Sequence, residues 1–150
     1  MSQFNPDFNE LNQPVHQERI LMPSTSLSAS TAIAVTNFAG RGAMFFMNIT
    51  SAFPGSGSTT YALKVKAIMP NAVLSAVTIA ACAPMSASGV STLIIYPGAL
   101  RSSTAPSAST DAAMAVFGCP LPRTFNVVVS LSTGATSKEV TMSLGMTTLY

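Results

Sequence analysis

Apolar residues recur at every second position through most of the chain after residue 30, and this spacing predicts strands that bury one face. The chain shows no convincing helical period, and turn residues such as Pro97-Gly98 and Thr133-Gly134 separate the alternating segments. The segments are residues 43–49, 61–69, 91–96, 125–131 and 140–146, with weaker candidates at 31–36 and 73–80. We therefore expect an all-β domain over residues 31–150, an antiparallel β-sandwich of jelly-roll type.

One face of each strong segment is expected to enter the core. The inward sets include Ala43, Phe45, Met47 and Ile49; Tyr61, Leu63, Val65, Ala67 and Met69; Phe125, Val127, Val129 and Leu131; and Val140, Met142, Leu144 and Met146. Lys64 and Lys66 fall on the opposite face of their strand. The stretch 98–122 is rich in Ser and lacks this pattern, so we expect a long loop that either has a function of its own or packs on a neighbour.

The first 30 residues differ in composition and are expected to form an N-terminal arm and hinge. Residues 1–22 are rich in Asn, Gln and acidic residues, and Pro6 and Pro14 argue against a continuous helix. Four isolated apolar residues could anchor this arm on a partner: Phe4, Phe8, Leu11 and Val15. The alternative is a disordered tail. Residues 23–30 are predicted to be a Ser-rich hinge.

The chain carries only twelve charged residues and one His, which removes most of the side chains that catalysis uses. His16 lies in the N-terminal segment, outside the predicted β-domain, so a Ser-His-acid triad is not expected. Cys82 and Cys119 have no metal-ligand spacing and are expected to be buried, reduced thiols of a protein made in a cytosol, with a disulfide left open. We therefore expect no enzyme activity, no catalytic residue, no metal site and no cofactor.

So little charge also suits a surface that faces other protein, because interspersed charge keeps free proteins apart. We expect a homo-oligomer, with a trimer favoured. After residue 22 the six basic residues are scattered along the sequence, which argues against nucleic-acid binding. No apolar run reaches the length of a membrane span, and no signal peptide is visible, so no membrane partner is expected.

Arg123 is expected to have a structural role. It follows Pro122 and opens the strand that carries Phe125, so its guanidinium could bind carbonyl groups of the long loop. Asp111 is the only acidic residue of that loop and could pair with Arg123.

Several stretches, in this order, resemble small virion proteins of tailed bacteriophages. They are residues 37–43 (NFAGRGA), 45–51 (FFMNITS), 60–66 (TYALKVK), 93–98 (LIIYPG), 121–129 (LPRTFNVVV) and 140–145 (VTMSLG). The resemblance implies a structural protein of the virion without enzyme activity, most often a decoration (cement) protein on the capsid surface, assembled in the host cytoplasm. Such proteins commonly have a β-sandwich body, often form trimers, and use an extended arm to clamp the major capsid protein.

Two alternatives remain open. The first is another virion part, such as a tail, head-tail joining or fibre-base protein, because residues 67–72 are apolar where many such phage chains are polar. The second is a carbohydrate- or receptor-binding sandwich. The absence of Trp and the presence of only three Tyr count against the second alternative.

Overall fold

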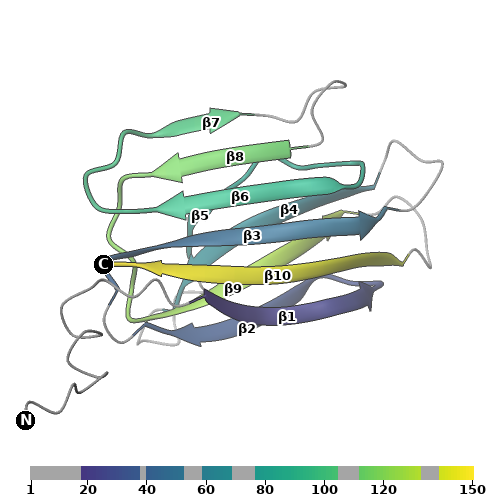
Figure 1. Ribbon diagram of the computed structural model, residues 1–150, viewed down its shortest axis with the longest axis horizontal. Helices are drawn as coiled ribbons and strands as arrows, with labels where there is room; N and C mark the ends of the chain where they lie inside the picture. The colour runs from purple at the N-terminus through teal and green to yellow at the C-terminus, as the bar shows by residue number, and fades with distance from the viewer. Residues whose placement is uncertain (1–17, 38–39, 53–58, 69–76, 105–111, 133–138) are drawn as a thin grey trace, which may run out of the picture.

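The computed structural model describes residues 18–37, 40–52, 59–68, 77–104, 112–132 and 139–150, and this part of the chain is built from strands without a helix (Figure 1). The strands are β1 (Glu18–Leu27), β2 (Thr31–Thr36), β3 (Gly42–Ser51), β4 (Thr60–Ala67), β5 (Val77–Ala81), β6 (Gly89–Ile95), β7 (Ser102–Thr104), β8 (Ala112–Phe117), β9 (Thr124–Ser132) and β10 (Val140–Leu149). They form a six-stranded sheet, β1-β10-β3-β6-β8-β7, and a four-stranded sheet, β2-β9-β4-β5. The prediction of an all-β sandwich is confirmed.

The strands pair from the outside of the sequence inward. β1 pairs with β10, β2 with β9, β3 with β6 and β4 with β5, all antiparallel. Pairing of β10 with β3 joins two of these strand pairs in the larger sheet, and pairing of β9 with β4 joins the other two in the smaller sheet. β8 and β7 extend the larger sheet beyond β6, and β8 runs parallel to β6, so the expectation of purely antiparallel pairing fails at this one place.

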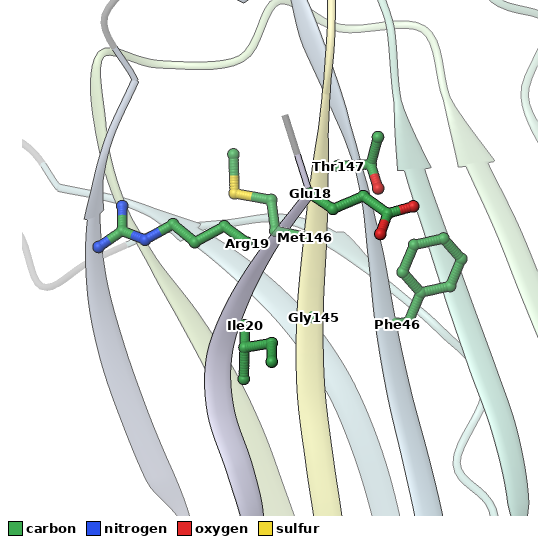
Figure 2. Close-up of a pocket in the computed structure, with 7 residues that line it drawn as sticks. All are labelled: Glu18, Arg19, Ile20, Phe46, Gly145, Met146 and Thr147. Atoms are coloured by element: carbon green, nitrogen blue, oxygen red, sulfur yellow. The ribbon is translucent and has the colours of Figure 1, made fainter. Parts of the chain in front are cut away.

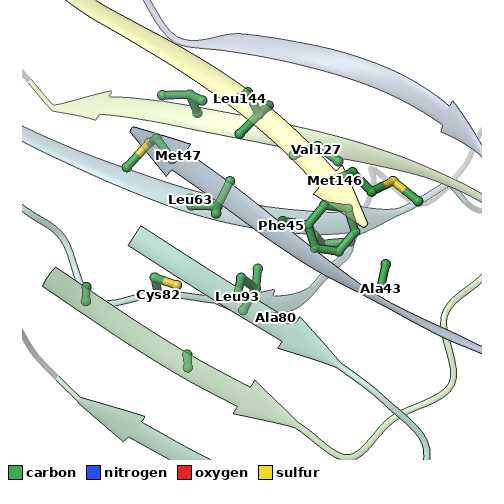
Figure 3. Packing of buried hydrophobic residues seen from close by; sticks show 14 of the residues in the cluster. Ala43, Phe45, Met47, Leu63, Ala80, Cys82, Leu93, Val127, Leu144 and Met146 are labelled. Atoms are coloured by element: carbon green, nitrogen blue, oxygen red, sulfur yellow. The ribbon is translucent and has the colours of Figure 1, made fainter. Parts of the chain in front are cut away.

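The two sheets pack face to face through the side chains that alternation predicted to point inward. Phe45 of β3 and Phe125 of β9 are both fully buried, and their rings meet edge to face with centroids 5.8 Å apart and planes at 84°. Figure 3 shows Leu63, Leu93 and Val127 in the same layer. The predicted inward sets of β3, β9 and β10 are buried, apart from the partly buried Leu131, and those of β4 are buried as far as Val65.

The prediction of a hinge is wrong for residues 23–27, because they belong to the ten-residue strand β1. The strand tolerates Pro23 because it is an edge strand, where one side of the backbone needs no ladder hydrogen bond. Register shifts between Ile20 and Met22 and between Met22 and Thr25 break the two-residue period. Strands were predicted from alternating apolar residues, and β1 lacks this alternation, so its sequence did not predict a strand.

The prediction of one long loop over residues 98–122 is wrong as well, because β7 and β8 lie within it. β7 has only three residues. The core-facing side of β8 is occupied by Ala113 and Ala115, while the exposed Met114 lies between them. Small and large apolar residues thus alternate in β8. Alternation of apolar with polar residues, which was the basis for predicting strands, is absent there.

Two of the turn glycines have a structural reason, close packing at Gly42 and a positive φ at Gly98. A Cβ on Gly42 would collide with the backbone oxygen of Ile95, because β3 begins directly against the end of β6. Gly98 has a φ of +81°, and the Ala99 N–H donates to the Tyr96 carbonyl at 3.1 Å. Pro97 and Gly98 thus occupy the two central positions of a type II-like turn between β6 and β7, where the second position needs glycine.

Candidate partner-binding surface

The outer face of the six-stranded sheet carries a row of side chains that crosses five strands. Phe46 of β3 lies opposite Gly145 of β10 on one side and Thr92 of β6 on the other. Ile20 of β1 lies opposite Gly145, and Met114 of β8 lies opposite Thr92. Opposite residues share a face of a sheet, so these five residues form one continuous strip.

Two parallel rows widen this strip. Thr147, Met44, Ile94 and Val116 form one, and Ser143, Asn48, Val90 and Ala112 form the other. We define the uncharged face as these three rows together: Ile20, Met44, Phe46, Asn48, Val90, Thr92, Ile94, Ala112, Met114, Val116, Ser143, Gly145 and Thr147. Glu18, opposite Thr147, is the charged residue at its margin. Ile20 is 77% exposed, Met114 43% and Val90 40%, so large apolar side chains remain accessible here.

A shallow hollow of about 230 Å³ lies at the β1 side of the uncharged face. Gly145 contributes no side chain, which leaves space between Ile20 and Phe46. Figure 2 shows the Glu18 carboxylate on the Phe46 side, whereas the Arg19 side chain points in the opposite direction. The hollow is open, and its floor and walls are mostly apolar, so it suits an inserted aliphatic or aromatic side chain better than a reaction.

The four arginines of the chain lie at one end of the sandwich, although they are far apart in sequence. The pairings place the starts of β1, β3 and β7 beside the ends of β10, β6 and β8, at the end that carries the C-terminus in Figure 1. Arg19, Arg41 and Arg101 stand at those starts. Arg123 stands in the connection from β8 to β9, where its carbonyl accepts from the Asn37 N–H at 2.7 Å.

All four arginines are exposed, and the Arg101 guanidinium lies 5.1 Å from the centre of the Phe117 ring. The four arginines therefore share one end of the sandwich, although Arg19 and Arg101 stand at opposite edges of the six-stranded sheet. The six-stranded sheet consequently presents two different surfaces, a broad uncharged face and an arginine-bearing end. The absence of a nucleic-acid partner stays a prediction.

Most of the site residues predicted from sequence lie outside the described residues: Phe4, Phe8, Leu11, Val15 and Asp111. Arg123 is described. Its side chain is exposed, and its guanidinium has no hydrogen bond with any other described residue. Its link to the fold is the backbone bond to Asn37, so the proposed grip on the long loop stays a prediction.

Neither cysteine suggests chemistry. Cys82 and Cys119 are both free thiols in the described part of the chain. The Cys82 thiol donates to the Thr92 carbonyl at 3.2 Å, and burial raises its pKa above the ordinary value of 9.0, which keeps it neutral and unreactive. Within the described ranges, no three His, Cys, Asp or Glu side chains come together as a metal site.

Sequence reasoning did not identify the uncharged face, although a signal for it exists. In residues 43–49 the set opposite the core also contains Met44 and Phe46, and in residues 91–96 both alternating sets contain isoleucine or leucine. A strand that is apolar on both sides indicates a second contact. Leu100, 90% exposed beside Arg101, was also missed because it was assigned to a polar loop.

The chain matches no protein-family model, no curated protein and no solved structure. Among the described residues there is no helix with the length and hydropathy needed to cross a bilayer. The resemblance to phage virion proteins therefore stays a hypothesis that rests on the quoted sequence stretches.

Proposed function

We propose that the protein is a structural virion component, a capsid decoration protein that binds the major capsid protein through the uncharged face. The observation that carries this proposal is the face itself, which has three rows of side chains and a charged residue only at its margin. Ile20, Val90 and Met114 expose large apolar side chains on this one face, and free monomers rarely gather such side chains on one surface without a partner.

The uncharged face suits a broad, static contact. Burying it removes no formal charge from water, so the large desolvation cost of ions does not arise. Phe46 and Met114 occupy the middle and one side of the face and supply the apolar anchors that commonly dominate binding energy. Thr92, Ser143 and Thr147 supply hydroxyl groups between the anchors.

The pairing order supports a finer fold assignment. With β7 and β8 set aside, the remaining eight strands pair first with last, second with second-last and so on inward. We infer that the sandwich is a jelly roll that carries β7 and β8 as an extension. Jelly rolls occur in viral capsid and lectin domains, which is compatible with the proposal but does not select it.

The arm is the second part of the proposal. Phe4, Phe8, Leu11 and Val15 are proposed to bind the neighbouring capsid subunit. The chain enters β1 at Glu18, which borders the hollow of the uncharged face, so an arm would leave the body beside its proposed contact surface. Removal of residues 2–16 spares β1 and should leave the body folded, but should weaken attachment to particles.

The test adds purified protein to capsids that lack it and measures bound copies against free concentration. Phe46→Lys and Met114→Lys place a charge in the uncharged face and should weaken binding at least about tenfold, equivalent to about 1.4 kcal/mol. Ser132→Lys places the same charge on an exposed residue of the other sheet and should bind like the wild type. If Phe46→Lys and Met114→Lys both bind capsids as tightly as the wild-type protein does, the proposed contact is disproved.

The carbohydrate- or receptor-binding alternative is favoured by one observation. The hollow combines the Phe46 ring with the Glu18 carboxylate and Thr147, a mixture of apolar surface and polar groups that could hold a sugar. A glycan array with wild-type protein and Phe46→Ala separates the two proposals, since only a lectin would lose specific spots. The tail, joining or fibre-base alternative uses the same uncharged face against a different partner and is distinguished by copy number.

A further inference from the structure

The sandwich has four sheet edges, and three of them carry features that prevent pairing with another strand. β1 has Pro23, the charged Glu18 and Arg19, and two register shifts. β7 has only three residues, and β5 has five with a register shift against β4. Short edge strands, charges, proline and bulges are the known defences against edge-to-edge association.

The fourth edge, β2, has none of these defences. It reads Thr-Ala-Ile-Ala-Val-Thr, without charge, proline or glycine, and its register with β9 is unbroken from Thr31 to Thr36. Among the described strands its only neighbour in the sheet is β9, so within this part of the chain its other side is an open edge. An uninterrupted, uncharged edge strand with β-branched residues is a template for another strand.

The hydrogen bonds show which residues of β2 direct their backbone N–H and C=O groups toward the open edge. The Asn37 N–H donates to the Arg123 carbonyl, directly beyond the Thr36–Thr124 pair, so Asn37 faces β9. On β9, the Thr124 carbonyl accepts a hydrogen bond from the Ile68 N–H on the β4 side. Thr124 therefore faces away from β2, as expected if its partner Thr36 also faces away from β9. Because the direction alternates along a strand, Ala32, Ala34 and Thr36 direct their N–H and C=O groups away from β9. All three are exposed.

We propose that β2 pairs antiparallel with β2 of a second copy of this chain, which joins the two four-stranded sheets into one. With Ala34 opposite the partner's Ala34 and Ala32 opposite the partner's Thr36, all three outward residues find partners, in about six backbone hydrogen bonds. This register is symmetric about a two-fold axis, as a closed dimer requires.

The side chains favour a second copy as the occupant. Opposed residues in this register are Ala with Ala, Ala with Thr and Ile33 with Val35, so no like charges meet. The nearest lysines of the sheet, Lys64 and Lys66, stand two strands away on β4, about 10 Å from β2. Since the other three edges are defended, the pairing stops at two copies and does not grow into a fibre.

This contact does not depend on the proposed virion role or on a trimer. It uses the edge of the smaller sheet, whereas the proposed capsid contact uses the outer face of the larger one. One short edge buries less than a standard interface of about 800 Å² per partner, so the isolated dimer should be weak and form at high protein concentration.

Disulfide trapping tests the register. In a Cys119→Ser background, where the remaining Cys82 is buried, Ala34→Cys should give a disulfide-linked dimer under mild oxidation, since opposite Cα atoms in a strand pair are about 5.5 Å apart. Thr36→Cys alone should not, because its own counterpart lies about four residues along the strand, roughly 13 Å away. Mixing Ala32→Cys protein with Thr36→Cys protein should restore the cross-link.

The controls decide the outcome. Ser132→Cys, exposed on β9, measures chance collision, and an Ala34→Cys yield no higher than that level overturns the proposal. Without oxidant, sedimentation of wild-type protein at rising concentration should show a monomer–dimer equilibrium that Ala34→Pro abolishes, because proline removes an N–H of the open edge. Circular dichroism and melting should confirm that Ala34→Pro remains folded. A strictly monomeric wild type, or self-association that survives in Ala34→Pro, contradicts the pairing.

Discussion

The edge-to-face contact between Phe45 and Phe125 joins the two sheets at the centre of the sandwich, and a double-mutant cycle measures it. Both side chains are fully buried, so each Phe→Leu change alters core packing and should lower the free energy of unfolding by about 1–3 kcal/mol. At 5.8 Å and 84°, the ring pair should add about 0.5–1.5 kcal/mol of coupling beyond burial. Leucine is preferred to alanine because each alanine would cost about 3–5 kcal/mol, and two would approach the whole stability of a domain.

The assay is urea unfolding of wild type, Phe45→Leu, Phe125→Leu and the double variant. Their unfolding midpoints are compared on the condition that the slope of unfolding free energy against urea concentration is the same for all four. Phe46→Leu is the matched control, because Phe46 is the next residue on β3 but faces outward and is only partly buried. It should change stability by less than about 0.5 kcal/mol. Additive effects of the two core changes, to within about 0.3 kcal/mol, would refute the contact between the sheets.

Further predictions concern single positions. Gly42→Ala should destabilise the protein by about 1–3 kcal/mol because its Cβ meets the Ile95 backbone, whereas Gly145→Ala, with the nearest atom at 3.9 Å, should change little; thermal melting compares the two. Gly98→Ala should lower stability by about 1 kcal/mol, since alanine is strained at a φ of +81°, and a rise in melting temperature would exclude that turn. Because burial raises the Cys82 pKa, the unfolded chain loses the thiol proton at lower pH than the folded chain, so stability should fall as pH rises above about 9; unfolding at pH 8 and pH 10 should show a smaller fall in Cys82→Ala than in wild type. Arg123→Ala tests the predicted grip on the loop: it should lower the free energy of unfolding by about 1–3 kcal/mol if the guanidinium holds loop carbonyls, whereas a change within about 0.5 kcal/mol, as for an ordinary exposed side chain, would exclude that role.

The inward faces of β3, β9 and β10 were predictable because a two-residue period is the direct consequence of burying one side of a strand. Phe125 and Val127 could be assigned to the core without knowing their neighbours. β1 could not be found in this way, since the irregular pairing around Pro23 breaks the period. β8 was missed because both of its faces are apolar, with Ala115 inward and Met114 outward.

The candidate surface depends on strand order, which local pattern does not determine. Phe46 and Met114 lie in one row, on either side of Thr92, only because β6 stands between β3 and β8. Arg19 and Arg101 reach the same end of the sandwich only because β1 and β7 start there. The open edge of β2 is likewise a property of the sheet, although its sequence shows the lack of charge and proline that makes the edge available.

The count of protein copies in purified virus particles tests the proposed role most directly. Quantitative gel densitometry against the major capsid protein would measure it. A decoration protein repeats with the symmetry of the shell, so the expected result is hundreds of copies per particle. A few dozen copies would contradict the capsid position and support the tail or joining alternative, and absence from purified particles would contradict a structural virion role altogether.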